Sequence, residues 1–506
     1  MYACLYIYLY VCVCALFLFV YTLIKMDSAL KALYDSTAIE AGSLYIVGRR
    51  DVAEEEETTF EFRDMTHPIR VPGLEDQAVT EVSAGPFHTI ALTREGMMYS
   101  WGDSQYGALG REGNPHVPQL VYHPSIRYIR FIKVACGSSF SMALSSRGLL
   151  YTWGTFMSQE GIYGYLPNVK IQTYPRIVNK VSMIRFINIA AGAAHCLALD
   201  DQGGVYSWGC GENEQLGVPM TRHQAGKLDL FPLKVALNSI VSIACGQFHS
   251  LAINRRGQVF AWGVNKFQQC GMMEKPEESH DEPGPELVPV PQLIPKFRKS
   301  YAPLALGTVG SLKSKASEAQ RMISTMTSKD GRFKEEEIGT RLNITEDDPM
   351  EQKLLHHDHS GDSLFDARPI NVAAGAEFSI VQTDNHSLIA FGRNDHGQLG
   401  ILFDKDHPCP GAIKSKKTGQ FEAIGYPHKN PWSPPEGVKK VASGFDHAVV
   451  ISTEGRAWGY GATEHHQLGL YTTKDAFKAT LIESILQRGR VLNAAGNDTA
   501  TYFVVV

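Results

Sequence analysis

Short apolar runs separated by polar turns recur along most of this chain. At residues 88–92 the apolar run HTIAL is followed by the polar segment TREG and then by a second apolar run, MMYSW. Apolar runs of this length are typical of β-strands. A polar pair followed by glycine is typical of a tight hairpin turn, because glycine can take a positive φ. The pattern therefore predicts a chain built from β-hairpins.

The hairpins belong to a longer unit that repeats. Six segments read alike, namely SAGPFHTIALTREGMMYSWG, ACGSSFSMALSSRGLLYTWG, AAGAAHCLALDDQGGVYSWG, ACGQFHSLAINRRGQVFAWG, AAGAEFSIVQTDNHSLIAFG and ASGFDHAVVISTEGRAWGYG, and a seventh, AAGNDTATYFVVV, ends the chain. Their leading glycines are Gly85, Gly137, Gly192, Gly246, Gly375, Gly444 and Gly496. In the first six segments a glycine follows seventeen residues later, and it is preceded by tryptophan in the first four. Five of the six also have glycine eleven residues on, His386 being the exception. Such self-similarity predicts a repeat architecture.

The two ends of the chain complete each other. SLYIVG at residues 43–48 has only the second half of a unit, whereas VLNAAGNDTATYFVVV at residues 491–506 has only the first half. Joined, they form one composite blade and remove the exposed strand edges that an open array would leave. We therefore expect an all-β fold at residues 43–506, a seven-bladed β-propeller closed by N- and C-terminal strands.

Two units are longer than the others. The interval between the fourth and fifth leading glycines is 129 residues, against 52 to 55 for ordinary units. Its composition, rich in proline, glutamate, serine and lysine, favours a flexible insertion, which we place at residues 272–369. The HHDH motif at residues 356–359 resembles a metal cluster by composition only, and a solvated loop is preferred. A smaller insertion at residues 403–420 carries a basic string, interpreted as a solvated charge run rather than a nuclear-import patch. The string consists of Lys414, Lys416 and Lys417.

The first residues differ from the rest. Residues 2–24 carry no charge and are long enough to cross a bilayer. The alternating Tyr/Ile and Val/Cys of YIYLYVCVC is what translated TA and TG dinucleotide repeats give, and Met26 opens an ordinary polar segment. We interpret residues 1–25 as a spurious upstream extension, with a membrane anchor or signal as the alternative, and residues 26–42 as a short tail.

Composition and charge narrow the class of function. The formal net charge of −5 does not favour bulk attraction to nucleic acid. None of the nine cysteines forms a CxxC pair, which disfavours a zinc ribbon and favours a reducing compartment, cytosol or nucleus. The sequence has no P-loop, GxSxG elbow, HExxH, EF-hand or kinase signature. We therefore expect partner docking rather than covalent catalysis, with no cofactor and no metal.

The repeat motif AAG-x-x-H-x-L-A-L…G-x-V-Y-S-W-G…Q-L-G resembles that of the regulator of chromosome condensation family, over residues 43–506. Two other segments narrow the resemblance to members that exchange nucleotide on the Ran GTPase. WGTFMSQEGIYGYLP at residues 153–167 is similar to the family's loop that wedges against Ran near the nucleotide. GCGENEQLGVPMTRHQAGKLDLFPLKV at residues 209–235 is similar to the stretch that contacts the nucleosome acidic patch.

This resemblance implies a nuclear, chromatin-associated guanine-nucleotide exchange factor for Ran, a monomer that docks no membrane. Such a factor acts by differential binding and forms no covalent bond. The positions that match GTPase-binding residues are Asp51, His88, Glu160, Gly161, Ile162, Tyr163, Gly164, Tyr165, His195, His249, Asp446 and His447. Arg222 and Lys227 match chromatin anchors, because arginine holds carboxylates through paired hydrogen bonds. DNA contact is left open, since the segment after Met26 lacks a basic tail.

Several positions depart from the family pattern. Where aspartate, histidine or arginine is expected, the chain has Ser139, Phe140, Ala194, Val218, Phe378 and Thr499. These departures support an alternative, a non-catalytic propeller adaptor that has lost exchange activity. Because phenylalanine shares the position three residues after the leading glycine with the four histidines, packing at the blade rim is preferred for each histidine on the residues alone.

Overall fold

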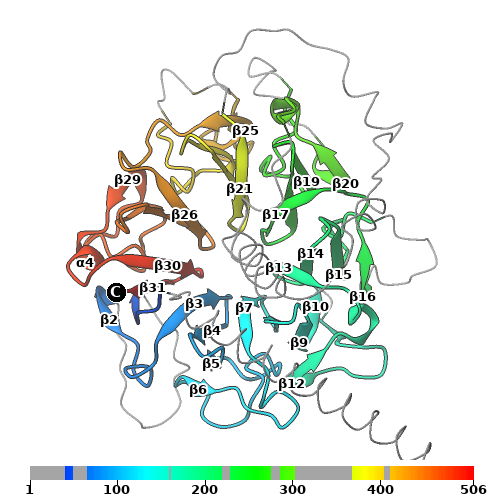
Figure 1. Ribbon diagram of the computed structural model, residues 1–506. Coiled ribbons are helices and arrows are strands. Elements are labelled where there is room, and N and C mark those ends of the chain that lie inside the picture. The colour runs from blue at the N-terminus through cyan, green and yellow to red at the C-terminus, as the bar shows by residue number, and fades with distance from the viewer. Residues whose placement is uncertain are drawn as a thin grey trace, which may run out of the picture.

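The structure is a computed structural model that describes residues 40–48, 65–158, 161–218, 228–274, 285–302, 367–403, 409 and 411–506. Within these residues the chain forms seven antiparallel sheets of four or five strands and one separate two-stranded sheet. The seven sheets stand around a common axis as blades (Figure 1). The predicted seven-bladed β-propeller is confirmed.

Blades 1 to 4 each run from an inner strand near the axis to an outer strand at the rim. Blade 1 contains β3 (Val79–Ala84), β4 (His88–Thr93), β5 (Met98–Gly102) and β6 (Gln119–Leu120). Blade 2 contains β7 (Phe131–Cys136), β8 (Phe140–Ser145), β9 (Leu150–Gly154) and β12 (Gln172–Ile177). Blade 3 contains β13 (Phe186–Ala191), β14 (His195–Asp200), β15 (Val205–Cys210) and β16 (Leu228–Lys234). Blade 4 contains β17 (Ile240–Cys245), β18 (His249–Asn254), β19 (Val259–Val264) and β20 (Leu287–Leu293).

The remaining blades include one with five strands. Blade 5 contains β21 (Pro369–Ala374), β22 (Phe378–Thr383), β23 (Leu388–Arg393), β25 (Phe421–Lys429) and the edge strand β24 (Ala412–Lys414). Blade 6 contains β26 (Val438–Ser443), β27 (His447–Ser452), β28 (Ala457–Gly461) and β29 (Ala476–Leu481). The short helices are η1 (Asn179–Val181), η2 (Pro295–Phe297) and α4 (Glu483–Leu486).

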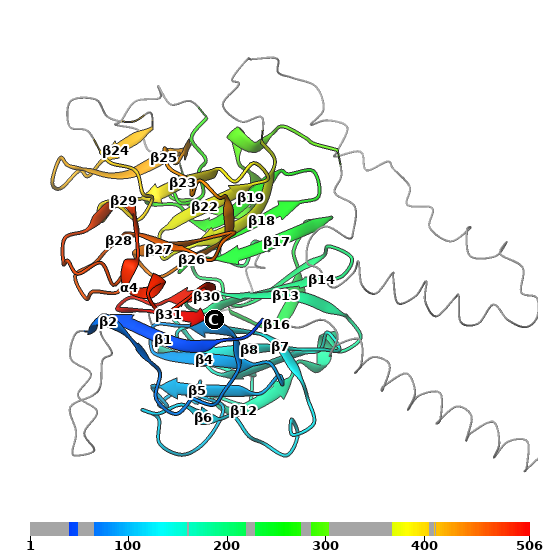
Figure 2. The same ribbon diagram turned by 60° about the vertical axis from the view of Figure 1, so that its left-hand side comes forward.

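Blade 7 closes the ring with strands from both ends of the chain. It contains β30 (Val491–Gly496), β31 (Ala500–Val505), β1 (Ser43–Gly48) and β2 (Met65–Arg70). Ser43 pairs with Val505 and Gly48 with Ala500, so β1 and β31 are matched along their whole length. Figure 2 shows β1 beside β31 near the C-terminus. The predicted composite blade is confirmed because backbone pairing continues across the two ends.

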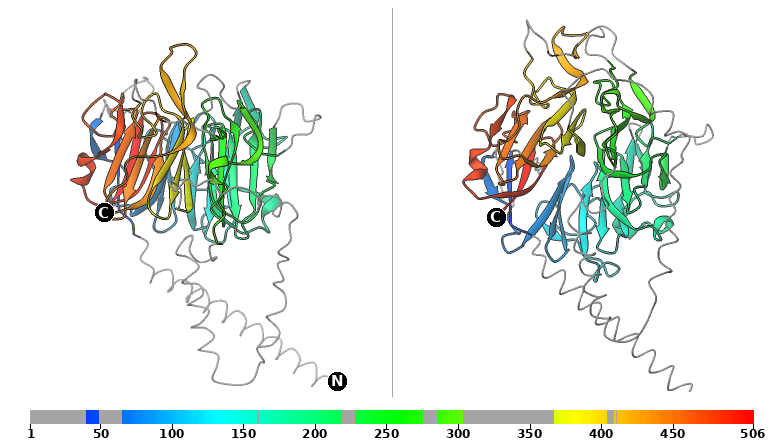
Figure 3. Two further views of the ribbon diagram at one scale, coloured as in Figure 1. Left: turned by 90° about the horizontal axis from the view of Figure 1, so that it is seen from above. Right: turned by 45° about the horizontal axis from the view of Figure 1, so that its top comes forward.

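The ring has two faces that carry different loops. The tight turns between the second and third strands lie on one face, which we call the turn face. The third strands end on the opposite face, where the two-stranded hairpin of β10 (Phe156–Ser158) and β11 (Gly161–Gly164) follows β9. We call it the hairpin face. Figure 3, in its left view, shows the blades edge-on with the β24–β25 region, in orange, projecting from one side.

The glycines of the repeat are required for two different reasons. The turn glycines have positive φ, 81° at Gly96 and 77° at Gly257, as a tight hairpin turn demands. His386 takes the same conformation, with φ of 64°. The leading glycines are required by close approach instead. A Cβ on Gly246 would lie only 2.1 Å from the ring of His249, three residues later.

Large rings lie at one depth between neighbouring blades, and two of them form hydrogen bonds across the junction. Trp153 Nε1 in blade 2 donates to the Ala108 carbonyl of blade 1 at 2.7 Å. Trp262 Nε1 in blade 4 donates to the Gln215 carbonyl of blade 3 at 2.9 Å. Phe391 and Tyr460 are fully buried at the corresponding positions of blades 5 and 6. The inter-blade core is therefore partly polar at these two junctions, where the preceding blade supplies the acceptor.

The long insertion is more structured at its start than expected, because η2 and the buried Ile294 and Phe297 also lie within it. Residues 287–293 lie within the predicted insertion at residues 272–369, yet they form β20, the outer strand of blade 4. Pro289 and Pro291 obscured this strand in the sequence, but an outer strand tolerates proline because one row of its N–H groups pairs with no other strand. The rest of the predicted insertion from residue 303 to residue 366, with the HHDH motif, lies outside the described residues.

The N-terminal expectations also fall largely outside the structure. Residues 1–39, including the apolar segment, are outside the described residues. In the part of the chain that the structure does describe, no helix combines the length and the apolar character needed to span a bilayer.

Candidate functional site

The four histidines of the repeat lie between blades rather than on a face. Each ring nitrogen Nε2 contacts a hydroxyl of the next blade, and every one of these side chains is 0 to 2% exposed. The pairs are His88–Ser141 (2.7 Å), His195–Ser250 (3.0 Å), His249–Ser379 (3.0 Å) and His447–Thr501 (2.8 Å). A rigid partner docking on the surface cannot touch them directly.

The serine partners fix the tautomer of three of these rings. Ser141 Oγ donates its only hydrogen to the Ala108 carbonyl at 2.7 Å, so it must accept from the Nε2–H of His88. Ser250 and Ser379 donate in the same way to the Gln215 and Gln269 carbonyls. The Nδ1 atoms are buried without a hydrogen-bond partner. The imidazole rings are therefore neutral, and each forms a hydrogen bond from one blade to the next.

Burial controls the charge of these histidines. Loss of solvation lowers the pKa of His88 and His447 to about 4, and that of His195 and His249 to about 3. All four are uncharged at neutral pH. The family resemblance implied that they bind the GTPase, whereas the residues alone favoured packing, and the structure buries all four between blades.

The hairpin β10–β11 is the part of the implied wedge that the structure describes. Ile162 lies in β11 and its side chain is 45% exposed. Gly161 and Gly164 flank it with φ of 121° and 119°, a region that favours glycine. Glu160 lies outside the described residues, and so does the side chain of Tyr163. Ile162 is therefore the apolar group that the described hairpin offers to a partner.

Tyr165 differs from the expectation of a surface residue. It is 6% exposed, and its hydroxyl lies 2.8 Å from Thr152 Oγ1 and donates to the Thr152 carbonyl at 3.2 Å. Burial raises the pKa of this phenol. Tyr165 therefore supports the base of the hairpin and is part of the core, so replacing it would disturb the fold locally rather than remove a contact.

Asp446 lies in a cluster of charges on the hairpin face. Arg393 joins Glu377 at 2.9 Å and Asp395 at 2.7 Å, and Gln398 Nε2 donates to Asp446 at 3.4 Å. Burial raises the pKa of the Asp446 and Glu377 carboxyl groups, which Arg393 opposes. Both carboxylates therefore gain from a further cation.

One more ion pair extends this cluster toward the next turn. His396 Nδ1 lies 2.8 Å from Asp475. Burial opposes protonation of His396, but the hydrogen bond to Asp475 and the surrounding carboxylates raise its pKa overall. Four carboxylates thus face one arginine and one histidine, and the surplus of negative charge suits a basic group from a partner.

Sequence reasoning identified Asp446 but missed its neighbours. Glu377, Arg393 and Asp475 come from three separate segments of blades 5 and 6, which pack side by side. The charged run RNDH at residues 393–396 was the available signal. The other implied positions, Asp51, Arg222 and Lys227, lie outside the described residues.

Comparison with known proteins agrees with this architecture. Residues 41–502 match the RCC1-like domain family. The chain is 27% identical over 413 residues to Regulator of chromosome condensation from Mus musculus, which covers 78% of this chain and 90% of that protein. It is 26% identical over 432 residues to Guanine nucleotide exchange factor SRM1 from Saccharomyces cerevisiae, covering 79% and 73%.

A solved structure shares the fold as well. The crystal structure of Prp20p from Saccharomyces cerevisiae has a TM-score of 0.69 with 24% identity, and the likeness covers 92% of each chain. The family match spans all seven blades from β1 to β31. The chain therefore belongs to the RCC1-like domain family.

Proposed function

We propose that this chain is a guanine-nucleotide exchange factor for a Ran-type small GTPase, which it docks through its hairpin face. The observation that carries this proposal is the β10–β11 hairpin. In blade 2 it stands where blades 1, 3, 4, 5 and 6 have a compact turn, and it presents the apolar side chain of Ile162. The relatives named as exchange factors, and Prp20p, studied for its binding to Gsp1p, support the same activity.

The mechanism follows from differential binding. A factor that binds the nucleotide-free GTPase more tightly than the GDP-bound form lowers the affinity for GDP by the same ratio. The hairpin supplies a projecting apolar group, and the Asp446 cluster supplies carboxylates for a basic surface. No side chain of this chain forms or breaks a covalent bond in such a scheme.

The implied GTPase-binding residues divide into two roles under this proposal. Gly161, Ile162 and Asp446 form the contact surface, and the buried Gly164 shapes the hairpin behind them. Asp51 and Glu160, which lie outside the described residues, and the side chain of Tyr163 join this surface. The four buried histidines and Tyr165 are positioning residues that hold the hairpin face in shape.

We also propose that the protein acts in the nucleus on chromatin, with Arg222 and Lys227 as anchors for the nucleosome acidic patch. The name of the mouse relative and the binding of Prp20p to histones support this part. Arginine suits such a contact because its guanidinium holds carboxylates at two points. Binding of purified nucleosomes tests it, and Arg222→Glu is expected to abolish the complex. Nucleosome binding unaffected by Arg222→Glu would remove the anchor role.

Release of fluorescent GDP from purified Ran tests the exchange activity. The chain is expected to accelerate release, and Ile162→Asp to slow that acceleration about tenfold, because a charge replaces the apolar contact in the docked state. Met183→Asp is the matched control, since Met183 is a 97% exposed apolar residue before β13 on the turn face. Release no faster than in buffer would refute the proposal and leave the adaptor alternative.

A further inference from the structure

Among the six junctions whose third-strand turns the structure describes, one lacks the element that closes the other five. Five blades end their third strand with a turn that reaches to the next blade, and we call these the bridging turns. They comprise residues 107–110, 214–217, 268–271, 397–400 and 466–469. Blade 2 has the β10–β11 hairpin instead, so the junction between blades 2 and 3 is built from other residues.

Most contacts of a bridging turn are replaced at this junction. The Cα of Gln215 lies against Gly263 at the regular junction between blades 3 and 4, and Phe156 takes that place against Gly209. In blade 3 the Ser207 hydroxyl donates to the Leu216 carbonyl of its own bridging turn, whereas in blade 2 Thr152 bonds to the hydroxyl of Tyr165. The hairpin therefore restores the packing and one hydrogen bond.

One hydrogen bond is not restored. Trp153 and Trp262 donate to the carbonyls of Ala108 and Gln215, which are backbone atoms of bridging turns. Trp208 occupies the same depth in blade 3 and is 2% exposed. Among the described residues no atom accepts a hydrogen bond from its Nε1. This Nε1 is not among the fully buried polar atoms that lack a partner, so it faces open space, and an occupant of that space can accept its hydrogen bond.

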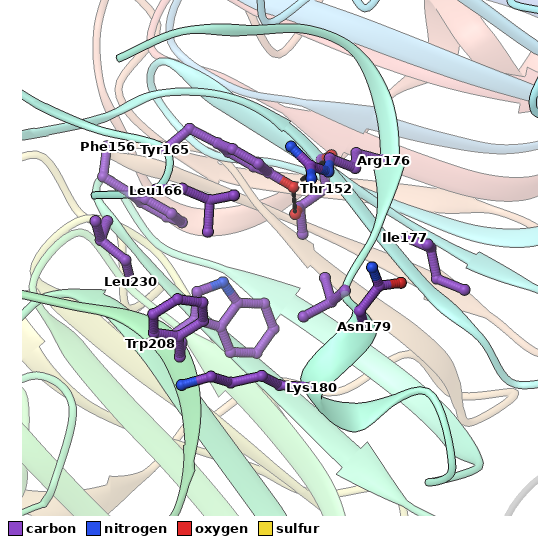
Figure 4. A pocket seen from close by; sticks show the side chains of 12 residues that line it. Thr152, Phe156, Tyr165, Leu166, Arg176, Ile177, Asn179, Lys180, Trp208 and Leu230 are labelled. Atoms are coloured by element: carbon purple, nitrogen blue, oxygen red, sulfur yellow. Dashed lines mark hydrogen bonds between the residues drawn. The ribbon is translucent and has the colours of Figure 1, made fainter. Parts of the chain in front are cut away.

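A cavity lies where the missing turn would have packed. Its volume is about 210 Å³, and Trp208, Phe156, Leu166 and Leu230 form much of its wall. Figure 4 shows Trp208 between Tyr165 and Leu166 on one side and Lys180 on the other. The space is apolar in its depth and has one N–H donor, which matches the leucine and backbone carbonyl of a bridging turn such as Gln215–Leu216.

The mouth of the cavity is basic. Arg176 and Lys180 are both exposed there and line its edge. Lys180 Nζ lies 3.4 Å from the centre of the Phe231 ring, which holds it over the opening. No described acidic residue forms an ion pair with Arg176. The charge at the rim therefore suits an acidic residue beside the apolar group.

We propose that this cavity binds an acidic peptide segment of a partner protein that presents a leucine-type side chain. The side chain fills the apolar depth, a backbone carbonyl next to it accepts the hydrogen bond from Trp208 Nε1, and a flanking carboxylate faces Arg176 and Lys180. The partner segment thereby completes the junction in the way that this chain's own bridging turns complete the others. This site lies at the base of the β10–β11 hairpin, where Phe156 lines it, and it includes neither Ile162 nor Asp446 of the contact surface proposed for the GTPase.

The chain itself supplies a suitable probe. The peptide Glu-Asn-Glu-Gln-Leu-Gly reproduces residues 212–217, the bridging turn that packs beneath Trp262. The full chain, labelled with 5-fluorotryptophan, is titrated with this peptide and followed by ¹⁹F NMR. Trp208→Phe assigns the resonance. We expect a saturable shift of the Trp208 resonance with no change at Trp153, whose Nε1 already has its acceptor.

Variants of the protein and the peptide separate the contributions. Leu166→Trp fills the cavity and is expected to abolish binding. Trp208→Phe removes the N–H donor and is expected to weaken binding about fivefold, as loss of one hydrogen bond does. Trp153→Phe is the matched control and leaves the affinity unchanged. A peptide with alanine in place of leucine is expected to lose most of the affinity.

Three outcomes would overturn the proposal. One is the absence of any saturable shift up to millimolar peptide. The second is equal binding by Leu166→Trp and wild type, with circular dichroism showing that both are folded. The third is equal binding of the leucine and alanine peptides. None of these results depends on whether the chain exchanges nucleotide.

Discussion

The two junctions on either side of blade 3 both hold neighbouring blades together, one through polar contacts and the other through aromatic contacts. Between blades 3 and 4, His195 donates to Ser250, and Ser250 and Trp262 both donate to the Gln215 carbonyl. Between blades 2 and 3, the corresponding positions of the histidine and the serine hold Phe140 and Cys196.

The phenylalanine also has a new partner. The rings of Phe140 and Phe156 lie 4.8 Å apart, so an aromatic pair replaces the histidine–serine hydrogen bond of the other junction. The departure at Phe140 is therefore matched to the hairpin that follows β9. The comparison shows that a projecting hairpin can replace a bridging turn when the histidine and the serine that bond at the other junctions are replaced as well. Trp208 is retained although the turn that would accept its hydrogen bond is absent.

Low pH is expected to have the largest effect, because it acts on all the regular junctions that contain histidine. The folded-state pKa values of about 3 to 4 lie below the value of about 6.5 in the unfolded chain, so below pH 6.5 the unfolded state binds more protons. Stability is complete above this pH and falls as the pH decreases toward 4, by about 1.4 kcal/mol per pH unit for each histidine. Denaturant unfolding between pH 7.5 and 5 measures the slope.

A histidine-to-phenylalanine variant sharpens this test. His249→Phe copies the residue that Phe140 and Phe378 place at the same position. It is expected to remove about a quarter of the slope that the four buried histidines produce. A slope that stays the same would mean that His249 is not buried in its neutral form.

The next largest loss of stability is expected when a side chain is added at a leading glycine, next to the histidine ring three residues later. Gly246→Ala places a Cβ 2.1 Å from the His249 ring, and we expect a loss of about 3 kcal/mol in the free energy of unfolding. Gly419→Ala is the control, because nothing lies within 4 Å of that position and only the positive φ of 66° opposes the new side chain. It is expected to cost about 1 kcal/mol. Equal losses in the two variants would contradict the close-approach explanation.

A smaller difference is expected between two tryptophans. Trp262→Phe removes a hydrogen bond to the Gln215 carbonyl, whereas Trp208→Phe removes none. Trp262→Phe is therefore expected to destabilise the protein by about 1 kcal/mol more than Trp208→Phe does. Urea unfolding of the two variants measures this difference. If Trp208→Phe proves the more destabilising, Trp208 has an acceptor after all and the comparison of junctions fails.

The smallest effect on stability is expected at the hairpin. Ile162→Asp changes an exposed side chain, so the free energy of unfolding is expected to shift by less than about 0.5 kcal/mol. Thermal unfolding of the variant measures this shift. A larger loss would place Ile162 in the core and would undermine its use in the nucleotide-release assay.

The fold was predictable from the sequence because every blade repeats the same pattern of residues. The turn glycines and the leading glycines are each required by the backbone geometry within one blade, and the two half-units at the chain ends indicate a shared blade. The strand β20 was not predicted, because Pro289 and Pro291 are unusual in a strand and are tolerated only at the outer edge of a sheet.

The candidate site was less predictable. The burial of Tyr165 depends on Thr152, thirteen residues earlier, and that of His249 depends on Ser379 in the next blade. The neighbours of Asp446 come together only when blade 5 packs against blade 6. The cavity at Trp208 arises because the β10–β11 hairpin replaces a bridging turn. The spacing of the repeat does not show which side chains lose a hydrogen-bond partner as a result.

Hydrogen–deuterium exchange of the chain with and without nucleotide-free Ran tests the central claim most directly. We predict protection at residues 156–164 and 393–398 on the hairpin face, and none at the tight turns around Gly96 and Gly257 on the turn face. Protection confined to the turn face, or no protection at saturating Ran, would contradict the account.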